Sequence, residues 1–393
     1  MFHDTKGSRD SIATTAQPDT LQIRLKMGAR LPAWAQPGLT WVTGHALPGQ
    51  RPLWRQTPQS QLAIGLVLAL GGLVTTLLLL HLSWHWSPLV VLSVSVTVSG
   101  ARFGQTNLLH QIAHGHFCGR PRLDRLVGHG LSMLLLLPPL DQYAAAHIVH
   151  HSEVGTLNDP DFAVLRLLGL EAGSPTKVLV RRLILALVNP RTHLTFFRTR
   201  VLDHLRHGVL RALVFLLVQG ALVATVVHAG GLTGWVLGCG LPWVLFNVSA
   251  ILQVLTEHVW LCEHEDEAPS AHRRHLTVGR FMGEMPPEGD AISSPVEWAG
   301  WWLRLLTVHL GARVLVVQGP LPGHDEHHAN AMSDEWPNAI FLREANRERR
   351  VYLGVWGLRA AIDLSLRSIS EARRANPTDT VDAAERDRLF RGM

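Results

Sequence analysis

The chain has 393 residues and a formal net charge of +5, with Lys and Arg at 36 positions against Asp and Glu at 31. Its three cysteines form no CxxC pair, which argues against a disulfide framework and against a thiolate zinc site. The Arg residues are scattered and flank apolar runs. That distribution argues against a nucleic-acid partner and favours anionic lipid headgroups.

The first 57 residues are predicted to form a cytoplasmic N-terminal segment. Residues 1–20 are polar and are expected to be disordered. They also lack the apolar core of a cleavable signal peptide. Residues 21–57 contain several prolines and three tryptophans, so we expect an irregular approach to the membrane interface, where tryptophan is favoured.

Two long runs contain no Lys, Arg, Asp or Glu, namely residues 56–101 and 212–256. Each is about 45 residues, enough for two spans of roughly 20 residues and a tight turn. The predicted fold is therefore an all-α integral membrane protein with about four transmembrane helices, arranged as two hairpins. Gly65, Gly71 and Gly72 in the first span would permit close helix contact.

The distribution of Lys and Arg predicts the orientation of these spans. Residues 102–211 contain 13 of them, whereas the two hairpin turns contain none. Because cytoplasmic loops carry the excess of basic residues, both termini and the middle segment are predicted to be cytoplasmic in this multi-pass protein.

Outside the hairpins we expect four kinds of segment. They are a re-entrant or interfacial segment at 131–140, surface helices near 178–187 and 351–369, an interfacial or buried segment at 296–315, and a mobile tail at 376–393.

Histidines cluster at three places in the chain. Residues three and four apart share one helix face, so the imidazoles within each cluster can converge on one point. A further histidine, in T-E-H-V-W, directly follows the second hairpin on the same predicted membrane face. Together they give nine candidate metal ligands: His110 and His114; His147, His150 and His151; His258; and His324, His327 and His328.

Nine imidazoles exceed what one ion takes, so the sequence predicts two metal ions. Such a nitrogen-rich centre beside a bilayer suggests oxygen activation on an apolar substrate, with iron as the first choice. We expect no catalytic residues beyond the ligands. Metal-bound imidazoles usually donate their second N–H to a carboxylate or carbonyl. The acids placed for that role are Glu153, Asp159, Asp161, Glu257 and Asp325.

The three clusters, with patterns HxxxH, HxxHH and HxxHH around two apolar hairpins, resemble the membrane fatty acid desaturase and hydroxylase superfamily. The resemblance covers roughly residues 60–330. It implies a cytoplasmic histidine-rich helical cap, two iron ions bound by the nine histidines, O₂ as co-substrate, and a lipid or acyl-chain substrate. It also implies a separate electron donor such as a ferredoxin, a rubredoxin or a b-type cytochrome.

On this basis we expect three regions: the segment 1–57, a membrane catalytic domain at 58–330, and a cytoplasmic C-terminal helix and tail at 331–393. The functional hypothesis is oxygen-dependent desaturation of a fatty acyl chain. Hydroxylation is the first alternative, because H-D-E-H-H-A-N and T-E-H-V-W look somewhat like the alkane hydroxylases. The first box also departs from habit at Gln111, where Asp or Glu is common.

Two other classes compete with an enzyme. A histidine-rich metal transporter or sensor needs ionisable residues inside its spans. Within the uncharged runs the histidines lie only at predicted turns, which disfavours transport. A structural membrane protein with incidental histidines would not retain iron.

Overall fold

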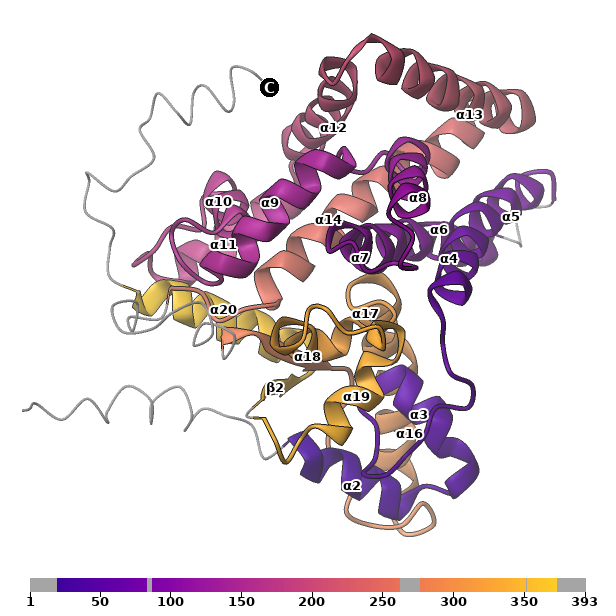
Figure 1. Ribbon diagram of the computed structural model, residues 1–393. Coiled ribbons are helices and arrows are strands. Elements are labelled where there is room, and N and C mark those ends of the chain that lie inside the picture. Colours follow the sequence, from indigo (N-terminus) through magenta and orange to yellow (C-terminus); the bar gives the residue numbers. More distant parts are fainter. Residues whose placement is uncertain (1–19, 83–86, 262–275, 351, 373–393) are drawn as a thin grey trace, which may run out of the picture.

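The computed structural model describes residues 20–82, 87–261, 276–350 and 352–372. The segments predicted to be disordered or mobile, residues 1–19 and 376–393, lie outside the described residues. The described chain is mostly helical, as predicted. Its one sheet, among these residues, has two short strands (Figure 1).

The N-terminal segment is more regular than predicted. It forms helices α2 (Thr20–Arg30) and α3 (Gln36–Thr43), joined by a 3-10 turn, η1 (Ala33–Ala35). The prediction was wrong because it treated the prolines as helix breakers. Pro37 lies in the first turn of α3, where backbone N–H groups make no hydrogen bond within the helix, so proline is tolerated there. These helices pack against α16 (Pro295–Arg304) and β2 (Leu353–Trp356), through Ile23, Met27 and Leu39.

The first predicted hairpin is formed by α4 (Pro58–Leu66), the π-helical stretch η2 (Val67–Gly71), α5 (Gly72–Leu79) and α6 (Ser87–Phe103). Two glycines bring its arms into backbone contact. A Cβ on Gly100 would lie 2.1 Å from the Ala69 nitrogen, and one on Gly72 would lie 2.6 Å from the Thr97 nitrogen. Gly71, by contrast, has nothing within 4 Å of that position.

The second hairpin is formed by α13 (Val209–Trp235), η5 (Val236–Gly240) and α14 (Leu241–Thr256). Gly231 has a non-helical backbone, with φ 60° and ψ −151°, so the chain turns there between two helices (Figure 1). This turn falls within the predicted one. By length and apolar composition, two helical stretches in the described chain qualify as membrane spans, Pro58–Leu79 and Val209–Thr256.

The segment between the hairpins is a series of helices. A π-helical stretch, η4 (Gly104–Leu109), leads from α6 into α7 (His110–Ala113). Then follow α8 (Pro121–Leu134), α9 (Leu140–Glu153), α10 (Pro160–Leu167), α11 (Thr176–Val188) and α12 (Pro190–Arg206). The break between α8 and α9 falls inside the predicted re-entrant segment. An apolar core of Phe162, Leu179, Leu255 and Leu366 joins α10, α11 and α14 to the C-terminal helix α20 (Leu358–Glu371).

The part beyond the second hairpin contains the sheet, which the all-α prediction missed. Strand β1 (Val278–Phe281) pairs in parallel with β2 (Leu353–Trp356), in the register Val278 to Leu353. Four-residue strands that pair across so long a separation leave no local periodic signal. The remaining elements are α16 (Pro295–Arg304), η7 (Leu305–His309), α17 (Leu310–Leu315), η8 (Leu321–Gly323), α18 (His324–Ala329), η9 (Trp336–Asn338) and α19 (Ala339–Ala345).

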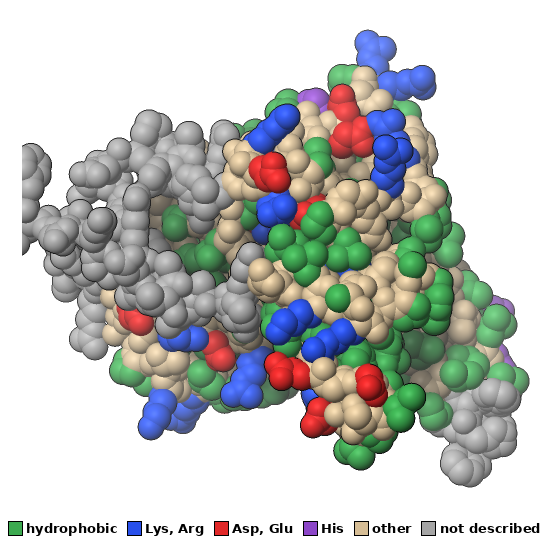
Figure 2. All heavy atoms as spheres, turned by 90° about the horizontal axis from the view of Figure 1, so that it is seen from below, with side chains coloured by type: hydrophobic (Ala, Val, Ile, Leu, Met, Phe, Trp, Pro, Cys, Tyr) green, Lys and Arg blue, Asp and Glu red, His purple; other side chains and the backbone are tan. Residues whose placement is uncertain are grey.

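One face of the molecule is shown from below in Figure 2. Where the grey atoms leave it visible, Lys and Arg side chains lie among Asp and Glu side chains, with apolar side chains between them. The positive net charge of the chain is therefore not gathered into one basic field on the visible part of this face.

Candidate metal centre

Four separate segments bring the nine candidate histidines together. His110 begins α7, and His114 caps its end. The second cluster lies on the last turns of α9. His258 follows α14, and the third cluster lies on α18. The π-helical stretch η4 directly precedes His110, and such widened turns are frequent at functional sites because they change which way the next side chains face.

The nine side chains divide into two groups of nitrogen atoms. Within each group, one ring nitrogen from every member lies within 4.8 Å of the others. The first group, which we call the five-histidine group, contains His110, His114, His147, His151 and His327. The second, the four-histidine group, contains His150, His258, His324 and His328. The two groups adjoin, since the rings of His151 and His328 stack with centroids 4.2 Å apart.

Nitrogen–nitrogen distances in the five-histidine group fit ligands around one ion. The Nε2 atoms of His110 and His327 are 2.7 Å apart, and those of His114 and His147 are 2.9 Å apart. His151 Nε2 lies 3.0 Å from His147 Nε2. An imidazole nitrogen lies about 2.1 Å from a bound transition-metal ion, so two ligands at right angles have nitrogens ~3 Å apart.

The four-histidine group is more deeply buried, and all four of its members are buried. The Nε2 atoms of His324 and His328 are 3.1 Å apart. His258 has no solvent exposure, and neither of its ring nitrogens has a hydrogen-bond partner. Because a buried polar atom without a partner is costly, these nitrogens fit a role as metal ligands.

Burial keeps most of these imidazoles neutral, which is the form that binds metals. It lowers the pKa of seven of them, and neighbouring imidazoles lower it further. For His114 the pKa falls to about 4. The others are His110, His147, His258, His324, His327 and His328.

His150 is the exception, because two carboxylates face its second nitrogen. Nδ1 of His150 lies 2.9 Å from Asp159 Oδ1 and 3.5 Å from Asp161 Oδ2. Burial lowers the pKa of His150, but Asp161 and Asp159 together outweigh it and bring the pKa to about 9. Asp159 is itself fixed, since it caps α10 and accepts hydrogen bonds from the backbone N–H groups of Asp161 and Gly155.

Glu257 lies beside the third cluster, next to the His324 nitrogen that also faces His328. Its Oε2 lies 3.3 Å from His324 Nε2 and accepts a hydrogen bond from Gln253 Nε2 at 2.5 Å. The fully buried Arg280 lies 3.8 Å away. Gln253 in turn accepts a hydrogen bond from the buried Arg102. A chain of polar contacts thus runs from helix α6 to a candidate ligand.

The other two predicted acids lie elsewhere. Asp325 pairs with Arg343, at 2.8 Å, and Glu153 accepts a hydrogen bond from the Thr156 hydroxyl. The sequence analysis missed Glu326, which is buried inside the third box and receives hydrogen bonds from Asn346, Arg350 and Tyr352. Its position two residues after His324 was the only available signal.

Gln111 also contacts the centre. Its Nε2 lies 3.4 Å from His327 Nδ1, while its Oε1 is buried without a partner. An imidazole that binds a metal through Nε2 keeps its proton on Nδ1. Exchanging the amide oxygen and nitrogen of Gln111 would then let Oε1 accept that proton and satisfy both groups. The amide thus fits the role that a carboxylate has in other first boxes.

The fold and the centre define a mostly helical protein with two histidine groups that could each hold a metal ion. The chain belongs to the fatty acid desaturase family, whose model matches residues 84–313. The match includes the first two boxes and His258 but ends before the third box, which the fold brings to the other two. No curated protein matches the chain closely enough to count as a relative.

Proposed function

We propose that this protein is an oxygen-dependent desaturase of a fatty acyl chain, with two iron ions held by the nine histidines. The observation that carries the proposal is the division into a five-histidine group and a four-histidine group with ligand-like spacing. In this family the bound irons supply the activation of O₂ and the removal of hydrogen from an unactivated methylene.

The chain's own residues have positional roles. Asp159 holds the Nδ1 side of His150 and so directs Nε2 of that ring toward the four-histidine group. Gln111 acts likewise on the Nδ1 side of His327. Glu257 instead lies beside Nε2 of His324, the nitrogen that also faces His328. Burial of both groups excludes bulk water, which protects a reactive oxidant from side reactions.

The reaction balances only with an external reductant. Forming one alkene breaks two C–H bonds, and reducing O₂ to two waters takes two further electrons and two protons. We propose that a separate redox protein supplies these electrons. We also propose four spans as two hairpins, with both termini and the centre on the cytoplasmic side, as the basic residues of the middle segment indicate.

Lipid mass spectrometry tests the reaction. Cells that express the wild type should accumulate lipids lighter by two hydrogens, and cells that express His150→Ala should not. His116→Ala is the matched control, because His116 lies in neither group and pairs with the exposed Asp334. Lipids heavier by one oxygen would instead establish the alternative, a di-iron hydroxylase.

A further inference from the structure

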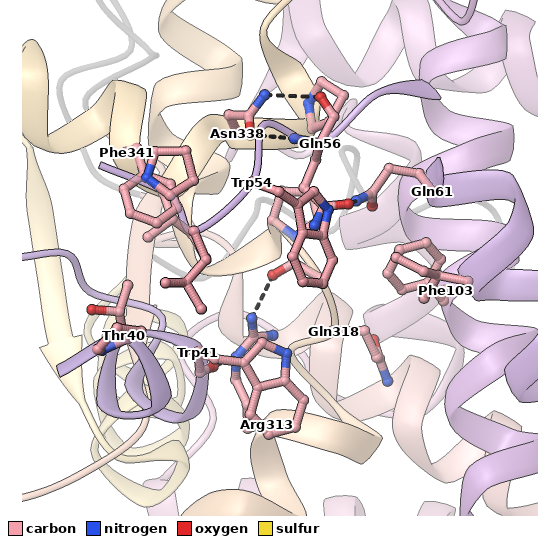
Figure 3. A pocket seen from close by; sticks show the side chains of 18 of the residues that line it. Thr40, Trp41, Trp54, Gln56, Gln61, Phe103, Arg313, Gln318, Asn338 and Phe341 are labelled. Atoms are coloured by element: carbon pink, nitrogen blue, oxygen red, sulfur yellow. Dashed lines mark hydrogen bonds between the residues drawn. The ribbon is translucent and has the colours of Figure 1, made fainter. Parts of the chain in front are cut away.

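A cavity of about 370 Å³ lies outside both histidine groups (Figure 3). That volume falls within the range of small-molecule sites. Its wall comes from α3, residues 50–56, α4, α6, α17 and α19. Most of the wall is apolar, and it includes Trp41, Trp54, Phe103 and Phe341.

One buried cation lines this cavity without a carboxylate partner. Arg313 is 3% exposed and donates to three backbone carbonyls, those of Trp41, Val317 and Gly319. Among the described residues, no Asp or Glu lines the cavity. Buried charges are normally paired, so a negatively charged ligand in this cavity would supply the partner that Arg313 lacks.

The donors of Arg313 suit a carboxylate. A guanidinium has five N–H groups, and the three carbonyls use one on each nitrogen, which leaves one N–H on each terminal nitrogen. Two such donors match the two oxygens of a carboxylate. Gln61 and Gln318 also line the cavity, and each has a buried oxygen without a partner, which a water bound beside the carboxylate would satisfy.

Exposed apolar residues line the cavity close to the first candidate span. Leu53 is 79% exposed and Trp54 is 61% exposed, a few residues before α4, the first candidate span. Exposed tryptophans of this kind lie at membrane interfaces. A ligand that arrives there is a lipid, and the apolar wall suits its chain.

The cavity also adjoins the metal centre. Pro320 lines it and lines a smaller cavity beside His110, His324 and His327. Asn107, one turn before His110, lines the smaller cavity and has an unpartnered amide nitrogen. A lipid whose headgroup is held at Arg313 would therefore have the start of its hydrocarbon chain close to the histidine groups.

We infer that this cavity binds the carboxylate end of a single-chain lipid, with Arg313 as its counter-ion. The inference rests on the proposed function, because it makes this lipid the substrate of the adjoining centre. Binding itself needs neither iron nor turnover and is measured separately.

The test compares four sixteen-carbon probes on the purified full chain in detergent: hexadecanoate, hexadecanol, hexadecyltrimethylammonium and hexadecyl phosphate. We expect hexadecanoate to bind at least tenfold more tightly than the alcohol, and the ammonium compound not to bind. Equal affinity for the acid and the alcohol would overturn the inference. Hexadecyl phosphate that binds more tightly than hexadecanoate would also overturn it, in favour of a phosphate headgroup.

Matched variants locate the site. Val314→Trp places a large ring in the cavity, whereas Val308→Trp places it on a side chain that is 63% exposed and does not line the cavity. We expect Val314→Trp to weaken hexadecanoate binding at least tenfold and Val308→Trp to leave it unchanged. Wild-type affinity in folded Val314→Trp would refute the assignment. If Val314→Trp does not fold, Ile340→Trp fills the same cavity from α19.

Iron content and lipid products of the same preparations separate the two proposals. Val314→Trp should keep the wild-type iron content and lose product formation. If the wild type holds no iron yet binds hexadecanoate in a way that Val314→Trp abolishes, the lipid site stands while the desaturase proposal and the substrate assignment fail.

Discussion

Nδ1 of His150 and Oδ1 of Asp159 are 2.9 Å apart in an environment that excludes solvent from both side chains. Asp159 also caps α10, so its carboxylate cannot turn away without exposing the end of that helix. The local fold therefore determines which nitrogen of His150 is available to a metal ion.

Asp159→Asn tests this relationship. The substitution removes the charge that attracts the Nδ1 proton, and loss of such a partner typically weakens metal binding about 10- to 100-fold. We expect iron to be lost from the variant at chelator concentrations that leave the wild type loaded, as measured by elemental analysis. Asp363→Asn, which affects only an exposed pair with Arg359, should behave like the wild type. Equal iron retention in both variants would contradict the assigned role.

Glu257→Gln should lower the stability of the protein. Glu257 is the buried carboxylate next to Arg280 and His324, and breaking a buried ion pair on one side leaves the other charge uncompensated, at a cost of roughly 3–5 kcal/mol. The expected result is a clearly lower thermal unfolding temperature in detergent. An unchanged temperature would show that Arg280 is compensated by its contacts with the Gln253 carbonyl and the Thr256 hydroxyl.

Two substitutions of Gln111 should have different effects on iron binding. Gln111→Leu removes the amide that contacts His327 Nδ1 and should reduce iron affinity by about 10-fold or more. Gln111→Glu restores the residue type common in the family and should retain iron. Titration with a chelator, followed by the iron absorption spectrum, measures both. If Leu and Glu give the same affinity, the contact has no part in metal binding.

The close contact in the first hairpin predicts a difference between two glycines. Gly100→Leu would place side-chain atoms against the backbone of Ala69, and such overpacking costs roughly 1–3 kcal/mol or more. Gly71→Ala should be tolerated, since nothing lies within 4 Å of the new atom. Thermal unfolding of the two variants in one detergent makes the comparison. Equal loss in both would mean that α6 does not pack on the first span as described.

Sequence patterns predicted the parts of this protein that depend on local spacing. The apolar runs placed the turn at Gly231, and helical periodicity placed His147, His150 and His151 on one surface. The helices near residues 20–43 were missed because prolines at helix starts read as helix breakers. The pairing of β1 with β2 was missed because it joins segments far apart in the chain.

In the site, too, local patterns could be predicted from the sequence, whereas contacts between distant segments could not. Eight of the nine histidines could be chosen from their spacing, and His258 from its place after the second hairpin. Their division into two groups could not be predicted, because each group draws on three separate segments. Of the five acids, Asp159, Asp161 and Glu257 lie beside box histidines, whereas Arg343 takes Asp325 away from them. Long-range packing determines which residue a buried acid contacts. The residues next to Asp325 in the sequence therefore could not predict its contact with Arg343.

The central claim is that two irons are bound, one by each histidine group. Iron content and Mössbauer spectra of the purified protein, loaded with ⁵⁷Fe, test it most directly. The account predicts about two irons per chain in the wild type, with binding at one site weakened selectively by His327→Ala and at the other by His328→Ala. A single iron per chain, or identical spectra for the two variants and the wild type, would contradict it.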